Sequence, residues 1–470
     1  MVVVKILALL ALCFFFPLRA WAATYYVDCS TGNNSNDGSS GTPWLTLRHA
    51  ADTISSGDTV VIKDGTCTST EASNDAHWGP SGSSGAYTTW KCENHQGCTI
   101  NGPIRSVTQT NPSYYSFEDL IVTNSGFWWQ ANVGTLQHFR VIGCDISGGT
   151  RINEEDTDRA NWSGIFIQDA TNAYIGYNHI HDISSDTTPC LGGTAHCGAG
   201  IKAYRPTDSV YEHNLIEDNA IEAISDKETA VRSIVRYNIL KNNGFTAYYA
   251  NNQGTSTDGH IYENIIECDN DDEFGIFFKI SVDDYEINNN TFYNCAGGQH
   301  HDSTTTEGDS NTGNSVHDNI YYKSSVGTAD PWTLEFQRWD ANEPTTLDYN
   351  IYYNARALDN RNCDSGEVTA GHCDAPVTTY TPLSGSNFTS WKSDHSGYDV
   401  HSAVGDPLFV DAGEGNFHLQ GGSPASGTGT SGQDIGAYPR NDDTVIGPSS
   451  GGGGGPASST LTYKPMSRIL

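Results

Sequence analysis

Basic side chains are scarce in this sequence. Its 470 residues include 24 lysines and arginines against 56 aspartates and glutamates, and the formal net charge is −32. A surface this acidic repels other polyanions, so we expect no binding to nucleic acid or to an anionic membrane. No two cysteines are spaced as Cys-x-x-Cys, which disfavours a zinc site. No segment carries a sustained helical period of apolar residues, which disfavours an α-helical domain.

The sequence does contain a short repeated motif with an asparagine at its centre. The motif occurs seven times, at Asn178, Asn214, Asn238, Asn264, Asn290, Asn319 and Asn350. The intervals are 36, 24, 26, 26, 29 and 31 residues, and each repeat carries short β-branched or aromatic strands. This period predicts an all-β fold, a right-handed parallel β-helix with one coil per repeat. Asparagines at the same corner of successive coils are expected to stack as an amide ladder.

Composition divides the chain into four parts. Residues 1–22 have the pattern of a signal peptide, with an apolar run over Ile6–Pro17 and a small-x-small cleavage site, so we expect a secreted, extracellular protein. The N-terminal cap and first coil occupy 23–86, and the β-helix occupies 87–440. A flexible Gly/Ser-rich tail occupies 441–470, and no apolar run long enough to cross a membrane follows it.

Two further local features are expected from the sequence. Trp44–Ile54 has helical spacing and predicts an amphipathic helix that covers the open end of the first coil. Eleven cysteines remain after residues 1–22 are removed, so one thiol stays unpaired. Three predicted disulfides close short loops, namely Cys92–Cys98, Cys190–Cys197 and Cys363–Cys373. A fourth, Cys268–Cys295, is predicted to link adjacent coils.

The strand before each ladder asparagine alternates inward and outward side chains. Aligned on its inward residues, it predicts one outward column of Phe166, Lys202, Glu222, Tyr248 and Phe277. A second predicted column contains Gln168, Tyr204, Ile224, Ala250 and Lys279. Lysine, carboxylate and tyrosine on one exposed face suit β-elimination from a uronic-acid polymer, which needs a base, a proton donor and a positive charge. The alternative is a solvated Lys202–Glu222 ion pair with no catalytic part.

Two stretches carry a resemblance to known families. Residues 25–44 resemble the N-terminal cap of secreted bacterial β-helix proteins, a group that includes pectate-lyase-like enzymes. Glu222–Lys227, followed by a strand that ends at Asn238, resembles a segment of the alginate lyase and chondroitinase B family. This resemblance implies a polysaccharide lyase in which Glu222 helps to bind Ca²⁺ and Lys227 abstracts the proton.

The chain departs from that family pattern at two positions. Ala220 stands where the family has a second calcium-binding glutamate, and Tyr248 lies near the place of its catalytic arginine. Arg205 and Arg232 are the candidates to replace that arginine.

The resulting hypothesis is a monomeric lyase that acts on an acidic extracellular polysaccharide. The catalytic candidates are Lys227, Lys202, Tyr248 and Arg205. The substrate-binding candidates are Arg232, Tyr204, Lys279 and His300. The candidate calcium ligands are Glu222, Asp226, Asp269 and Asp271. The alternatives are a glycoside hydrolase or an epimerase on the same fold, and a non-catalytic carbohydrate-binding or adhesion protein.

Histidines form a further group of acid–base candidates, at His179, His181, His213, His300 and His301. His179 and His213 flank ladder asparagines, where a structural role is expected.

Overall fold

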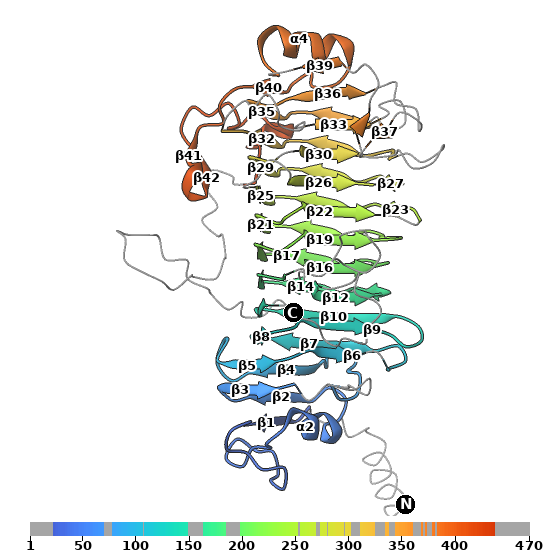
Figure 1. Ribbon diagram of the computed structural model, residues 1–470, viewed down its shortest axis with the longest axis vertical. Coiled ribbons are helices and arrows are strands. Elements are labelled where there is room, and N and C mark those ends of the chain that lie inside the picture. Colours follow the sequence, from blue (N-terminus) through green and yellow to red (C-terminus); the bar gives the residue numbers. More distant parts are fainter. Residues whose placement is uncertain are drawn as a thin grey trace, which may run out of the picture.

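Three long sheets of parallel strands lie side by side along one axis, as seen in the computed structural model (Figure 1). The structure describes residues 22–69, 78–106, 108–148, 163–184, 198–251, 254–268, 273–279, 281–295, 297–301, 311–324, 334–337, 344–360, 368–369, 372–373, 378–380 and 383–437. Successive coils contribute one strand to each sheet and pair with the coils before and after them. The chain is therefore a parallel β-helix, as its repeats predicted.

The strands are assigned to these sheets as follows. Sheet 1 contains β1 (Thr24–Val27), β2 (Thr59–Ile62), β4 (Thr88–Cys92), β7 (Ser113–Glu118), β10 (Leu136–Ile142), β13 (Ala170–Thr171), β14 (Tyr174–Gly176), β17 (Val210–Glu212), β20 (Ile234–Arg236), β24 (His260–Tyr262), β28 (Glu286–Asn288), β31 (Ser315–His317) and β34 (Thr346–Asp348). Sheet 2 contains β3 (Gly65–Thr68), β5 (Cys98–Asn101), β8 (Ile121–Thr123), β11 (Asp145–Ser147), β15 (His179–His181), β18 (Leu215–Glu217), β21 (Ile239–Lys241), β25 (Ile265–Glu267), β29 (Thr291–Tyr293), β32 (Ile320–Tyr322), β35 (Ile351–Tyr353) and β40 (Ala403–Val404). Sheet 3 contains β6 (Ile104–Ser106), β9 (Phe127–Gln130), β12 (Ser163–Gln168), β16 (Ala199–Tyr204), β19 (Glu222–Lys227), β22 (Thr246–Asn251), β26 (Phe274–Phe278), β30 (Gly297–His301), β33 (Leu334–Gln337), β36 (Ala357–Asn360) and the antiparallel β39 (Thr378–Tyr380). Three short pairs complete the set: β23 (Ser256–Thr257) with β27 (Val282–Asp283), β37 (Val368–Thr369) with β38 (His372–Cys373), and β41 (Phe409–Asp411) with β42 (Asn416–Leu419).

The asparagine ladder is present and buried. All seven side chains are at most 2 % exposed. The side-chain NH₂ of each of the first six donates to the amide oxygen of the next asparagine, at distances that run from 2.9 Å between Asn238 and Asn264 to 3.3 Å between Asn319 and Asn350. The residue before each asparagine has a left-handed backbone, for example Tyr237 with φ of 57°. The ladder therefore satisfies polar groups at a tight turn between sheets 1 and 2.

Helices close both ends of the solenoid (Figure 1). Helix α2 (Leu47–Thr53) confirms the predicted N-terminal helix. It is capped by the Thr46 hydroxyl, which accepts from the backbone N–H of His49 at 3.2 Å, and it buries Leu47 and Ala50. At the other end, α4 (Gly385–Asp394) buries Phe388 and Trp391. No described helix has the length and apolar character needed to cross a membrane.

Disulfides join neighbouring coils and close one loop. Cys92–Cys98 and Cys268–Cys295 confirm two of the predicted pairs, and Cys29–Cys67 is a third bond that the sequence did not predict. Cys144 is a buried free thiol. The predicted pairs Cys190–Cys197 and Cys363–Cys373 include residues outside the described parts of the chain.

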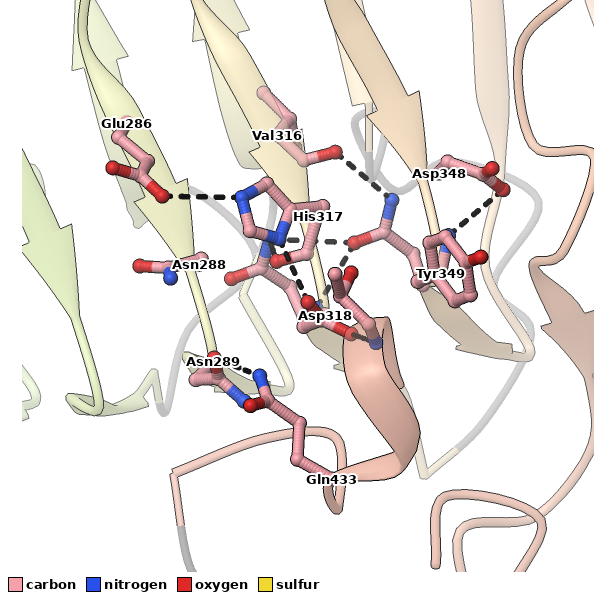
Figure 2. A network of polar contacts seen from close by, with 12 residues as sticks. Glu286, Asn288, Asn289, Val316, His317, Asp318, Asp348, Tyr349 and Gln433 are labelled. Carbon is pink, nitrogen blue, oxygen red and sulfur yellow. Dashed lines mark hydrogen bonds and ion pairs between the residues drawn. The ribbon is translucent and has the colours of Figure 1, made fainter. Parts of the chain in front are cut away.

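The segment 405–437, which contains β41 and β42, lies on the outside of sheet 2. Phe409, Phe417 and Ile435 form a second apolar cluster with Ile320 and Ile351 of that sheet. Its end is held by polar contacts around the buried Asp318, shown in Figure 2. The Asp318 carboxylate accepts from the backbone N–H of Thr430 at 2.7 Å and contacts His317 Nδ1 at 2.7 Å, and Gln433 donates to Asn289 at 3.3 Å.

Replacement of a central ladder residue should destabilise the fold. In Asn238→Ala, the N–H groups of Asn214 lose their acceptor and the carbonyl of Tyr211 loses its donor. Each buried group left unsatisfied costs about 1–3 kcal/mol, so we expect a loss of that size or more in the free energy of unfolding, measured by urea denaturation. Gln137→Ala, which removes an exposed amide from β10, is the control and should change it by less than about 0.5 kcal/mol. Equal effects of the two substitutions would contradict the ladder's role.

Loss of the Asp318 carboxylate should release the end of the outer segment. Asp318→Ala removes the acceptor for Thr430, and we expect faster hydrogen exchange at residues 427–437 while the amides of β17 and β20 keep their protection. Asp283→Ala is a matched control, because Asp283 also accepts a backbone N–H, that of Thr312 at 2.7 Å, but does not contact this segment. Unchanged exchange in Asp318→Ala would show that the apolar cluster alone holds the segment.

Candidate functional site

The outer face of sheet 3 carries the residues that the sequence singled out, but in a different register. Lys202 pairs with Ser225, which pairs with Tyr249, and Tyr204 pairs with Lys227. The predicted neighbours Glu222 and Tyr248 pair instead with Thr246 and Ile224. The predicted column of Lys202, Glu222 and Tyr248 is therefore wrong. In the structure, one outward column contains Trp128, Phe166, Lys202, Ser225, Tyr249 and Phe277, and the other contains Gln130, Gln168, Tyr204 and Lys227.

The error has a physical reason. Side chains alternate with period two, so a shift of one residue moves every side chain of a strand to the other face. Ile221, Ala223 and Ile224 are all apolar and offer two alignments for β19. The correct one places Asp226 inside the coil, where a carboxylate is not expected. In β22, Tyr248 and Tyr249 are the same residue type, and the pattern does not distinguish them.

Lys202 and Lys227 are the central pair of this face. Lys202 is 0 % exposed and Lys227 is 5 % exposed, although both lie outside the β-helix core. The two side chains interact, and the Lys227 ammonium lies 5.5 Å from the ring centroid of Tyr249. Burial lowers the pKa of Lys227, the charge of Lys279 acts in the same direction, and the charge of Glu222 opposes them. A lysine in such surroundings is closer to the neutral amine that a base requires.

Asp226 and Tyr248 lie inside the coil. The Asp226 carboxylate accepts from the hydroxyls of Tyr211 and Tyr248, both at 3.0 Å, and all three residues are 0 % exposed. Burial raises the pKa of Asp226 to about 6, and burial together with the Asp226 charge raises the pKa of Tyr248 well above its usual value. This position keeps both groups away from a polymer on the outer face.

The two candidate arginines are engaged by carboxylates. Arg205, at the end of β16, lies between Asp169 of the preceding coil, at 2.6 Å, and Glu228 of the following coil. Arg232 contacts Asp208 at 2.6 Å on the exposed surface. Neither arginine lies within a strand of sheet 3.

Of the four candidate calcium ligands, the structure describes two, Glu222 and Asp226, and both are buried. Asp226 is inside the coil, Ala220 has no ligand atom, and Glu222 is fully buried and acts electrostatically on Lys227. Ca²⁺ takes six to eight oxygen ligands. Asp269, Asp271 and the side chain of His300 lie outside the described parts of the chain.

Aromatic side chains continue the strip on either side of the lysines. Trp128 stacks on Phe166 with ring centroids 4.4 Å apart, and Arg105 lies over Trp128 at 5.9 Å. On the other side, Tyr249 packs against Phe277 at 5.5 Å. Sequence reasoning missed Ser225, Tyr249 and Arg105 on this face. The in-register stacking of sheet 3 would have identified them once one coil was aligned correctly.

Comparisons with known proteins identify the fold. No protein-family model matches the sequence, and no curated protein matches it. Among solved structures, the chain is similar to the pectate lyase Pel9A, with a TM-score of 0.55 and 15 % identity over 90 % of this chain and 97 % of that one. It is also similar to a rhamnogalacturonan lyase (TM-score 0.44, 15 % identity, 69 % of this chain and 89 % of that one). A mannuronic-acid-specific family 6 lyase from the human gut microbiota gives a TM-score of 0.39 and 16 % identity over 70 % of this chain and 86 % of that one. The expected resemblance to parallel β-helix polysaccharide lyases is confirmed for the fold.

The buried Asp226 carboxyl should make stability depend on pH. Its pKa in the folded chain is about 6 against an ordinary 3.8, so between these values the folded state holds a proton that the unfolded state has lost. Stability therefore falls as pH rises from about 4 to about 6, by at most about 1.4 kcal/mol per pH unit for this group, and is constant above. Asp226→Asn should have a shallower slope in urea denaturation at pH 4 to 7. Gln137→Ala, which removes no titratable group, is the control and should keep the wild-type slope.

Proposed function

We propose that this protein is a polysaccharide lyase that cleaves a uronic-acid polymer on the outer face of sheet 3. The observation that carries the proposal is the pair of desolvated lysines, Lys202 and Lys227, side by side in a molecule that is otherwise strongly acidic. Such a pair gives a local positive charge where the rest of the surface repels a polyanion. Partly exposed rings on this face, those of Tyr204 and Phe277, supply surfaces on which sugar rings stack.

In this mechanism the two lysines have different parts. Lys227, with its lowered pKa, removes the proton from C5 of the uronate as the neutral amine. Lys202, as the ammonium, stabilises through its positive charge the negative charge that develops on the sugar carboxylate. Tyr204, in register beside Lys227, donates its hydroxyl proton to the leaving glycosidic oxygen. The bond from C4 to that oxygen breaks, and a C4–C5 double bond forms.

Glycoside hydrolysis is the alternative on the same fold. It requires two carboxyl groups on either side of the scissile bond. The residues in register beside the lysine pair on β16 and β19 are tyrosine and serine instead. Of the two glutamates that act on Lys227, Glu222 is fully buried and Glu228 is paired with Arg205. Elimination is therefore the better match to this face.

The lysine pair can be tested by substitution. The wild-type protein, incubated with alginate, pectate or chondroitin, should produce an ultraviolet-absorbing unsaturated uronate from at least one. Lys227→Ala should lower kcat by about 10²-fold or more, because the base is lost. Lys241→Ala removes a lysine that pairs with Glu267 at 3.5 Å on sheet 2, and it is the matched control with unchanged activity.

Product mass separates the remaining possibilities. Products of elimination weigh one water less than those of hydrolysis. New reducing ends without the double bond would replace the lyase with a hydrolase, and no change in any polymer would favour the non-catalytic alternative. Full activity of Lys227→Ala would remove Lys227 from the proposal.

A further inference from the structure

Two histidines and one aspartate gather on the outer face of sheet 2, away from the lysine pair. His179 and His181 alternate on β15, so both side chains point outward, and Asp145 pairs in register with His179 from the preceding coil. One nitrogen from each imidazole and a carboxylate oxygen lie within 4.8 Å of one another. Among the residues that the structure describes, this is the one group of three such donors that is so close.

The distances between Asp145 and the two histidines are longer than those of good hydrogen bonds. Asp145 Oδ2 lies 3.4 Å from His179 Nδ1, and Asp145 Oδ1 lies 3.4 Å from His181 Nε2. Both are longer than a good hydrogen bond to nitrogen. Two ligand atoms bound to one tetrahedral Zn²⁺ at 2.0–2.1 Å lie about 3.3 Å apart, so these two spacings, each to a different oxygen of the Asp145 carboxylate, are compatible with ligands that share an ion.

The other ring nitrogens have short contacts to separate carboxylates. His179 Nε2 lies 2.9 Å from Glu217, one coil further on, and His181 Nδ1 lies 2.8 Å from Asp182. A histidine that binds a metal through one nitrogen commonly donates its other N–H to a carboxylate, which fixes the orientation of the ring. The rings also stack, with centroids 4.0 Å apart, so both are held on the same side of Asp145.

We propose that Asp145, His179 and His181 bind a divalent transition-metal ion of the Zn²⁺ type. Two imidazoles and one carboxylate are the donors that Zn²⁺ prefers, whereas Ca²⁺ prefers an all-oxygen site. The three side chains are 27 %, 18 % and 23 % exposed, so the fourth position of a tetrahedral ion is accessible to water. The ion would link two successive coils, on a part of sheet 2 away from the apolar cluster that holds residues 405–437.

The site can be tested on tag-free, full-length protein dialysed against a chelator. Titration with Co²⁺ should give the visible absorption of a tetrahedral ion at one ion per chain, and Zn²⁺ should displace it while millimolar Ca²⁺ does not. The melting temperature should rise with Zn²⁺, because the ion binds the folded state.

Substitution of the ligands locates the ion. Asp145→Asn and His181→Ala should each weaken Co²⁺ binding by about tenfold or more. His260→Ala is the matched control: His260 is also a partly exposed histidine on a solenoid strand and contacts Glu286 at 3.1 Å, and its loss should leave binding unchanged. If His181→Ala does not fold, His181→Gln replaces it.

Two results would overturn the proposal: no stoichiometric Co²⁺ or Zn²⁺ binding by the wild-type protein, or equal binding by the wild-type, Asp145→Asn and His181 variants. The lyase assay is independent of this outcome, because its residues lie on sheet 3.

Discussion

The side-chain amide ladder is the interaction on which the rest of the structure depends. At the corner between sheets 1 and 2, each coil turns through a left-handed residue and then buries an asparagine. Stacked amides bond to the next coil through both the side-chain NH₂ and the backbone N–H. This specifies which residue of one coil lies over which residue of the next, and a parallel solenoid has few other means of setting that register.

The register of the coils also determines which side chains meet on the outer face of sheet 3. Lys202 and Lys227 are 25 positions apart in sequence, yet they lie diagonally across one coil boundary because Tyr204 pairs with Lys227. In a chain with a net charge of −32, this concentration of positive charge is a local exception. Its burial lowers the affinity of Lys227 for its proton, and the nearby glutamates limit that effect. The packing that places Lys227 on this face is therefore also what lowers its pKa.

The faces of the solenoid have separate roles. Sheet 3 carries aromatic residues and lysines along its outer surface, and sheet 2 carries the histidine cluster and the residues covered by segment 405–437. The interior is not wholly apolar either. Asp226 and Asp399 are both fully buried, each bonded to the hydroxyl of a core tyrosine, Tyr248 and Tyr352 respectively.

The sequence by itself determined the fold, the ladder, the N-terminal helix and two of the three described disulfides, because each depends on a local or periodic pattern of residue types. It also identified Lys202 and Lys227 as candidates for chemistry. Only the tertiary structure decided which side chains face outward beside them. Asp226 and Tyr248 point inward, and Ser225 and Tyr249 occupy the places predicted for Glu222 and Tyr248. Burial of a carboxylate costs little free energy when two tyrosine hydroxyls donate to it. The two tyrosines that bond Asp226 come from other strands, so the alternation of side chains within β19 does not reveal them. The same limit applies to Asp145, which lies 34 and 36 residues before His179 and His181 and meets them only when the coils stack in register.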